Sequence, residues 1–139
     1  MKKILLLDDN PDVIQIVEEV LAYDHYEVQS TQTCVDFLET IQSCKPDVIM
    51  LDYALSDGNG GELCKAIKAH PRTSDIPVII FSAYSRPGLD FIKEFGSDAF
   101  LAKPFGIDDL LKTVTEVMQK KSLLPVETLP PLRTLSGKN

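Results

Sequence analysis

The chain has 139 residues, 44% of them hydrophobic and 25% charged, and a formal net charge of -7. Its length fits one domain with a single core, and its negative charge argues against binding nucleic acid or an anionic membrane. No apolar run approaches the ~20 residues of a membrane helix. The two lysines near the N-terminus precede only four apolar residues, so we do not expect a signal peptide.

The first half of the chain alternates short apolar runs with longer amphipathic segments. Residues 4–7 form an apolar run that ends at two adjacent aspartates, Asp8 and Asp9. An Asn-Pro pair then suits the cap and first position of a helix, which apolar residues at helical spacing extend over 11–23. We expect the following elements to be a strand at 26–30, a helix at 33–43 and a strand at 48–51.

The second half continues the alternation after the loop DYALSDGNGG, which is rich in Asp, Gly and Asn. A sequence of strands separated by helices predicts an α/β fold, with a parallel sheet covered by helices on both faces. The apolar runs lack a period of two, as expected when both faces of a sheet are buried. The expected elements are helices at 62–70, 87–95 and 107–120, and strands at 77–81 and 99–102.

Residues 122–139 differ from the rest, with three prolines, five leucines and no periodicity. We expect them to form a tail outside a domain at 1–121. The leucines are too many for a purely solvated linker and favour packing on the domain or on a partner. The tail is too short and too weakly basic for a DNA-binding module, so the chain either acts alone or belongs to a longer protein.

The three cysteines form no CxxC pair and are odd in number. A disulfide framework or a zinc site is therefore not expected, and a reducing compartment is favoured. We interpret the cysteines as small buried hydrophobic residues and expect the protein to be cytoplasmic.

Polar side chains stand at the carboxyl ends of four predicted strands. Asp8 and Asp9 follow the first strand, Asp52 the third, Ser82 the fourth and Lys103 the fifth. Parallel strands bring these ends to one edge of the sheet, where open α/β sheets bind ligands. We therefore expect three carboxylates, a hydroxyl and an ammonium group in one crevice.

A divalent cation would relieve the repulsion among these carboxylates, since like charges disfavour joint ionisation. Mg²⁺ prefers such hard oxygen ligands. The remaining groups suit a phosphoryl group, because Lys103 offers a compact positive charge and Ser82 a hydroxyl donor. A carboxylate can attack phosphorus and form an aspartyl phosphate. Each residue alone has an ordinary structural explanation, but their coincidence at strand ends favours a site.

The chain resembles the receiver domain of bacterial two-component response regulators. The matching stretches, within residues 2–121, are ILLLDDN, PDVIMLDYALSDGNGGEL, IPVIIFSA and GSDAFLAKPF. The resemblance implies a (βα)5 flavodoxin-like doubly wound fold, whose five-stranded parallel sheet has the order 2-1-3-4-5.

The resemblance also implies a role for each site residue. Asp52 would accept the phosphoryl group, and Lys103 would pair with it. Asp8, Asp9 and Asp52 would bind Mg²⁺ together with the backbone carbonyl of Ala54.

Conformational switching is expected to involve Ser82, which would bond a phosphoryl oxygen, and Phe100, the rotating aromatic. The bond between Lys103 and Pro104 would be cis. The chain departs from the common family pattern in two places: Ser56 replaces a frequent proline, and Phe100 replaces a frequent tyrosine.

The resemblance also implies that two further positions border the path of the water that would hydrolyse the aspartyl phosphate. They are Ala54 and Tyr84, and neither is an acid or an amide that would orient water. We expect slow self-hydrolysis.

The expected function is a signalling switch that is not an enzyme beyond assisting its own phosphorylation and dephosphorylation. A histidine kinase or phosphotransfer protein would phosphorylate Asp52. The change would pass through Ser82 and Phe100 to a downstream protein at the face of the fourth helix, fifth strand and fifth helix.

Three alternatives remain: a phosphorelay intermediate, a Mg²⁺-dependent phosphohydrolase and a receiver that binds partners without phosphorylation. Ala54 stands where some such hydrolases place a second acid, and the chain has no cap insertion, which argues against the hydrolase. The complete set of site residues argues against the last alternative.

Overall fold

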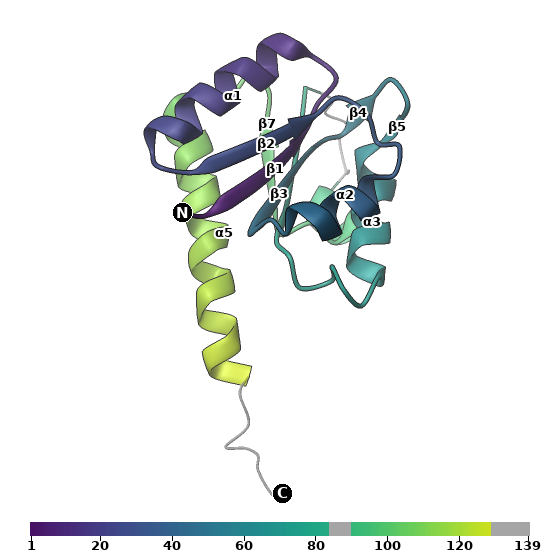
Figure 1. The fold of residues 1–139 in the computed structure, drawn as a ribbon, viewed down its shortest axis with the longest axis vertical. Coiled ribbons are helices and arrows are strands. Elements are labelled where there is room, and N and C mark those ends of the chain that lie inside the picture. The colour runs from purple at the N-terminus through teal and green to yellow at the C-terminus, as the bar shows by residue number, and fades with distance from the viewer. Residues whose placement is uncertain (84–89, 129–139) are drawn as a thin grey trace, which may run out of the picture.

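The structure is a computed structural model that describes residues 1–83 and 90–128, with side chains described up to residue 120. Its centre is a five-stranded parallel sheet in the order β2-β1-β3-β6-β7 (Figure 1). In chain order these strands are the first to fifth of the sheet, so the predicted order 2-1-3-4-5 is confirmed. The strands are β1 (Lys3–Leu7), β2 (Glu27–Thr31), β3 (Val48–Asp52), β6 (Val78–Ser82) and β7 (Ala99–Ala102).

Helices cover both faces of the sheet, as the alternation of elements predicts. One face packs against α1 and α5, and the other against α2, α3 and α4 (Figure 1). The helices are α1 (Pro11–Tyr23), α2 (Phe37–Cys44), α3 (Gly60–Ala69), α4 (Phe91–Phe95) and α5 (Ile107–Thr128).

The core divides into two apolar clusters, one on each side of the sheet. Ile4 and Leu6 of β1 face the cluster under α1 and α5, whereas Leu5 and Leu7 face the other. Every residue of β3 and β6 is buried. Burial on both faces explains why these strands show no alternation of polar and apolar residues in the sequence.

A short antiparallel hairpin follows β3 and was not predicted. It pairs β4 (Ala54–Leu55) with β5 (Gly58–Asn59) and leads directly into α3. The hairpin lies within the loop rich in Asp, Gly and Asn, and it places the residues after Asp52 beside the end of β1 (Figure 1).

The predicted helix start at 33 does not match the structure, and the predicted start at 87 lies outside the described residues. Residues 33–36 precede α2, because Asp36 has a left-handed backbone conformation (φ 56°), which interrupts a helix. Helix α4 begins at Phe91, after Asp90 accepts hydrogen bonds from two N–H groups of its first turn. Most of the predicted segment before it lies outside the described residues.

The last helix is longer than predicted. The sequence predicts its end at residue 120 and an irregular tail from 122, but α5 continues to Thr128. The prediction was wrong because Pro125 was taken as a sign of irregular structure, although the helix continues through it. A domain boundary at residue 121 stays a prediction.

None of the helices in the described residues combines the length and apolar character that crossing a membrane requires.

Candidate functional site

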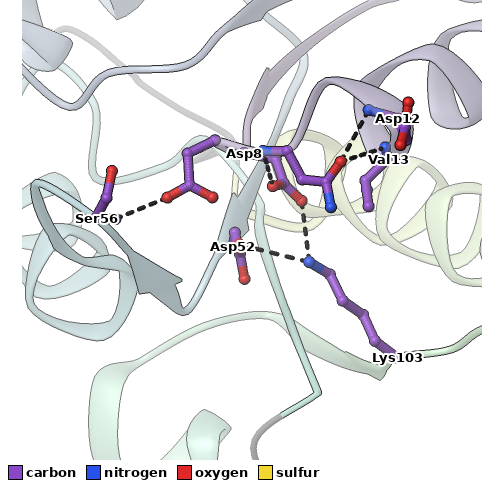
Figure 2. A network of polar contacts seen from close by, with 8 residues as sticks. Asp8, Asp12, Val13, Asp52, Ser56 and Lys103 are labelled. Carbon is purple, nitrogen blue, oxygen red and sulfur yellow. Dashed lines mark hydrogen bonds and ion pairs between the residues drawn. The ribbon is translucent and has the colours of Figure 1, made fainter.

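The first two site carboxylates lie directly after β1, where α1 begins. Asp8 is fully buried, and its Oδ1 accepts the N–H of Asn10 at 2.8 Å. The Asn10 side chain in turn caps α1, accepting the N–H groups of Asp12 and Val13 (Figure 2). The helix start thus fixes the turn that holds Asp8 at the edge of the sheet.

Asp52 approaches Asp8 from the adjacent strand β3, and Lys103 reaches both from the end of β7, at the edge of the sheet. Asp52 is the last residue of β3 and is 5% exposed. The Lys103 Nζ lies 3.0 Å from Oδ2 of Asp8 and 3.4 Å from Oδ2 of Asp52 (Figure 2). The ammonium group also lies 4.8 Å from the ring centroid of Phe81. One cation therefore neutralises part of the charge of two buried acids.

Backbone geometry holds Lys103 in this position. Its N–H donates to the carbonyl of Ser82 at 2.8 Å, which continues the pairing of β6 with β7 past the end of β7. The peptide bond between Lys103 and Pro104 is cis.

Asp9 completes the acidic cluster and contacts the β4–β5 hairpin. Its Oδ2 accepts the N–H of Ser56 at 2.8 Å (Figure 2). Carboxylate oxygens of Asp8, Asp9 and Asp52 all lie within 4.8 Å of one another. Three converging carboxylates are the hard oxygen donors that Mg²⁺ takes in proteins, so the residues present fit this ion.

The environment of Asp52 disfavours the ionised form of its carboxyl group in the folded protein. Burial, followed by the charge of Asp8, raises the pKa of Asp52 from 3.8 to about 6. The charge and hydrogen bond of Lys103 and the backbone N–H of Ala54 lower the pKa of Asp52, but do not outweigh burial. A bound cation would favour the ionised, nucleophilic form.

Ser82 and Phe100 lie on the next two strands. Ser82 ends β6 and is 2% exposed. Phe100, within β7, is half-buried, and its ring stacks on Phe91 of α4 with centroids 4.4 Å apart. Phe91 also meets Tyr53, the residue after Asp52, edge-on at 4.9 Å. Tyr84 lies outside the described residues.

Sequence reasoning missed the glycine that brings α3 against the site. A Cβ at Gly60 would lie 2.2 Å from the carbonyl oxygen of Asp52, so only glycine allows this approach. Asn59 caps the same helix by accepting the N–H of Glu62. An Asn-Gly-Gly run before an amphipathic segment is a signal that could have placed the helix start two residues earlier than predicted.

The fold and site define a flavodoxin-like domain with an acidic centre at the carboxyl edge of its parallel sheet. The family model of the response regulator receiver domain matches residues 4–115. The chain belongs to this family, whose members are signalling modules that interact with histidine kinases or phosphotransfer proteins.

Curated relatives are similar along most of the chain. The DNA-binding dual master transcriptional regulator RpaA of Synechocystis sp. is 31% identical over 127 residues, covering 90% of this chain and 52% of that protein. Transcriptional regulatory protein GltR of Pseudomonas aeruginosa is 29% identical over 126 residues, covering 90% and 52%. The chain thus spans about half the length of these relatives.

Solved structures show the same fold. The chemotaxis response regulator CheY4 of Vibrio cholerae has a TM-score of 0.77 and 29% identity, covering 84% of this chain and 98% of that one. A CheY-like response regulator receiver domain protein of Methanospirillum hungatei has a TM-score of 0.78 and 27% identity, covering 88% and 97%.

Proposed function

We propose that the chain is a phosphorylation-dependent switch of the cytoplasm that accepts a phosphoryl group on Asp52 from a phosphohistidine donor. The observation that supports this most is the arrangement at the sheet edge. A buried carboxylate lies 3.4 Å from a lysine ammonium group and close to two further carboxylates. One crevice thus combines a carboxylate that could accept the phosphoryl group, a cation that could pair with a phosphoryl oxygen, and carboxylates that could bind a metal ion.

In the proposed transfer, a carboxylate oxygen of Asp52 attacks phosphorus. The bond between phosphorus and the histidine nitrogen of the donor breaks, and the nitrogen keeps the electron pair. In the structure the Lys103 ammonium group contacts Asp8 and Asp52. During the transfer it would pair with a phosphoryl oxygen. Asp8, Asp9, Asp52 and the Ala54 carbonyl would hold Mg²⁺, which supplies positive charge against the phosphoryl oxygens when bound.

The proposed relay begins at Ser82, whose hydroxyl would bond a phosphoryl oxygen. Ser82 and Phe100 lie on adjacent strands, in a register that pairs Ile80 with Phe100 and Ser82 with Ala102. A shift at Ser82 would change the packing of Phe100 on Phe91 and so the face of α4, β7 and α5. We propose that an unknown protein partner binds this face.

The proposal is tested by incubating the protein with acetyl phosphate and Mg²⁺ and measuring its intact mass. We expect a gain of one phosphoryl group that disappears in Asp52→Ala and without Mg²⁺. Asp75→Ala is the matched control, because Asp75 is an exposed carboxylate just before the amino end of β6, at the opposite edge. An adduct that persists in Asp52→Ala would refute the assignment, and turnover of a phosphate ester would favour the phosphohydrolase alternative.

A further inference from the structure

Asp57 links two loops beside the site. It lies in the turn between β4 and β5, and its Oδ2 accepts the Thr33 hydroxyl at 2.6 Å and the Cys34 N–H at 3.1 Å. The Cys34 thiol donates to the Asp57 carbonyl oxygen at 3.1 Å. We call these three hydrogen bonds the Asp57 bridge. Together they fasten the β4–β5 hairpin to the loop between β2 and α2.

The sequence around the bridge fits this close approach. A Cβ at Gly58 would lie 2.7 Å from the Cys34 sulfur, so a larger residue would push the loops apart. The Thr33 hydroxyl also accepts the N–H of Val35 at 3.1 Å, which fixes its direction. Hydrogen bonds from Thr33 and then from the Cys34 backbone lower the pKa of the Asp57 carboxyl, so the bridge persists at neutral pH.

The same hairpin contacts the site carboxylates through its backbone. The Ser56 N–H, directly before Asp57, donates to Asp9 at 2.8 Å. The Ala54 N–H bonds Asp52 and lowers its pKa. At its end, the Gly60 N–H donates to the Tyr53 carbonyl at 2.8 Å. The hairpin therefore lies between two anchors, the site on one side and the Asp57 bridge on the other.

We propose that Asp57 is a positioning residue for the site, because its bonds to Thr33 and Cys34 hold the hairpin backbone against Asp9 and Asp52 and so raise the affinity for the divalent cation. The inference rests on the proposed function, which assigns Mg²⁺ to these carboxylates. Its physical basis is preorganisation: a hairpin already held in place loses less conformational freedom when its neighbouring carboxylates bind an ion.

The test is a calorimetric titration of the unphosphorylated protein with Mg²⁺. Asp57→Ala removes the acceptor of two hydrogen bonds, and we expect it to weaken Mg²⁺ binding by about three- to tenfold. Asp57→Asn is the matched variant, because it loses the same charge but keeps a side-chain oxygen for Thr33 and Cys34. It should stay within about twofold of the wild type. Thr33→Val, which leaves the charge of Asp57 in place, should weaken binding in the same direction as Asp57→Ala.

The outcomes separate the bridge from simple charge. If Asp57→Asn weakens binding as much as Asp57→Ala does, and Thr33→Val has no effect, Asp57 acts through its charge and the inference is wrong. Equal affinities in all variants would also overturn it. Urea unfolding of each variant verifies that it is folded at the temperature of the titration.

A separate variant distinguishes failure of this inference from failure of the proposed function. Asp9→Ala should abolish most of the Mg²⁺ binding of the wild type. If the wild type binds no Mg²⁺, or Asp9→Ala binds it equally well, the assigned metal site is wrong. If Asp9→Ala fails to bind while the Asp57 variants match the wild type, only the positioning role of Asp57 is refuted.

Discussion

Replacing the proposed acceptor by its uncharged isostere should stabilise the metal-free protein. Burial raises the pKa of Asp52 from 3.8 to about 6 in the folded chain. Between these two values the folded state binds more protons than the unfolded state, so the free energy of unfolding falls as pH rises through this window. One unit of pKa corresponds to about 1.4 kcal/mol, so keeping Asp52 ionised at neutral pH costs about 3 kcal/mol.

Asp52→Asn removes this charge while keeping the shape of the side chain and an oxygen that can accept from Lys103. We expect it to unfold at higher urea concentration than the wild type at pH 7.5 without Mg²⁺. Its advantage in free energy of unfolding should grow by about 1 kcal/mol between pH 5 and pH 7.5, because Asp52 of the folded wild type ionises within this range. Circular dichroism during urea unfolding at both pH values measures it.

Asp75→Asn serves as the control, since Asp75 is exposed and should show no such advantage. Millimolar Mg²⁺ should narrow the difference, because the wild type binds the cation and Asp52→Asn lacks one of its ligands. An advantage that is equal at both pH values, or a wild type that is the more stable at pH 7.5, would refute the electrostatic account of the site.

Three further predictions concern single residues. Lys103→Met should lower the free energy of unfolding by about 1–3 kcal/mol, because it leaves buried acids without their cation. In urea unfolding, millimolar Mg²⁺ should restore most of the lost stability, and an equal loss with and without the ion would contradict the prediction. Gly60→Ala should lower the free energy of unfolding by about 3 kcal/mol, because its Cβ would overlap the Asp52 carbonyl. Gly106→Ala, whose Cβ would meet nothing closer than 3.9 Å, should leave the stability nearly unchanged. Similar losses in the two variants would show that the structure relieves the overlap at Gly60. Tyr84→Glu should shorten the half-life of the phosphorylated protein, followed by intact mass; an unchanged or longer half-life would count against slow hydrolysis by the wild type.

The sheet and the position of the acidic cluster were predictable because they follow from a rule of parallel sheets. Strand ends that are far apart in the sequence meet at one edge, so Asp8, Asp52 and Lys103 could be grouped without knowing any helix. The structure places the Lys103 Nζ 3.0 Å from Oδ2 of Asp8 and 3.4 Å from Oδ2 of Asp52. Their chemical roles came from the family resemblance, and these roles remain proposals.

Contacts between loops were not predictable in the same way. Residues 33–36 stay outside α2 because Asp36 has a left-handed backbone conformation, and Asp57, more than twenty positions away, accepts hydrogen bonds from Thr33 and Cys34 there. The Gly60 requirement likewise depends on the carbonyl of Asp52, which no local pattern reveals. The length of α5 was missed because a proline usually ends or kinks a helix, whereas α5 continues through Pro125.

The site illustrates why a stability optimum and a functional optimum differ. Two fully or nearly buried acids share one lysine, so the metal-free cluster keeps an unbalanced negative charge inside the fold. An Asn at position 52 would relieve that charge, yet it would remove both the proposed nucleophile and a metal ligand. The cost that burial imposes on the charge of Asp52 is therefore linked to cation binding. Because a bound cation relieves the repulsion among the carboxylates, it binds more tightly than it would to carboxylates that do not repel one another. A measured increase in stability on Mg²⁺ binding that is lost in Asp52→Asn would show this linkage directly, and an increase of equal size in both proteins would place the ion elsewhere.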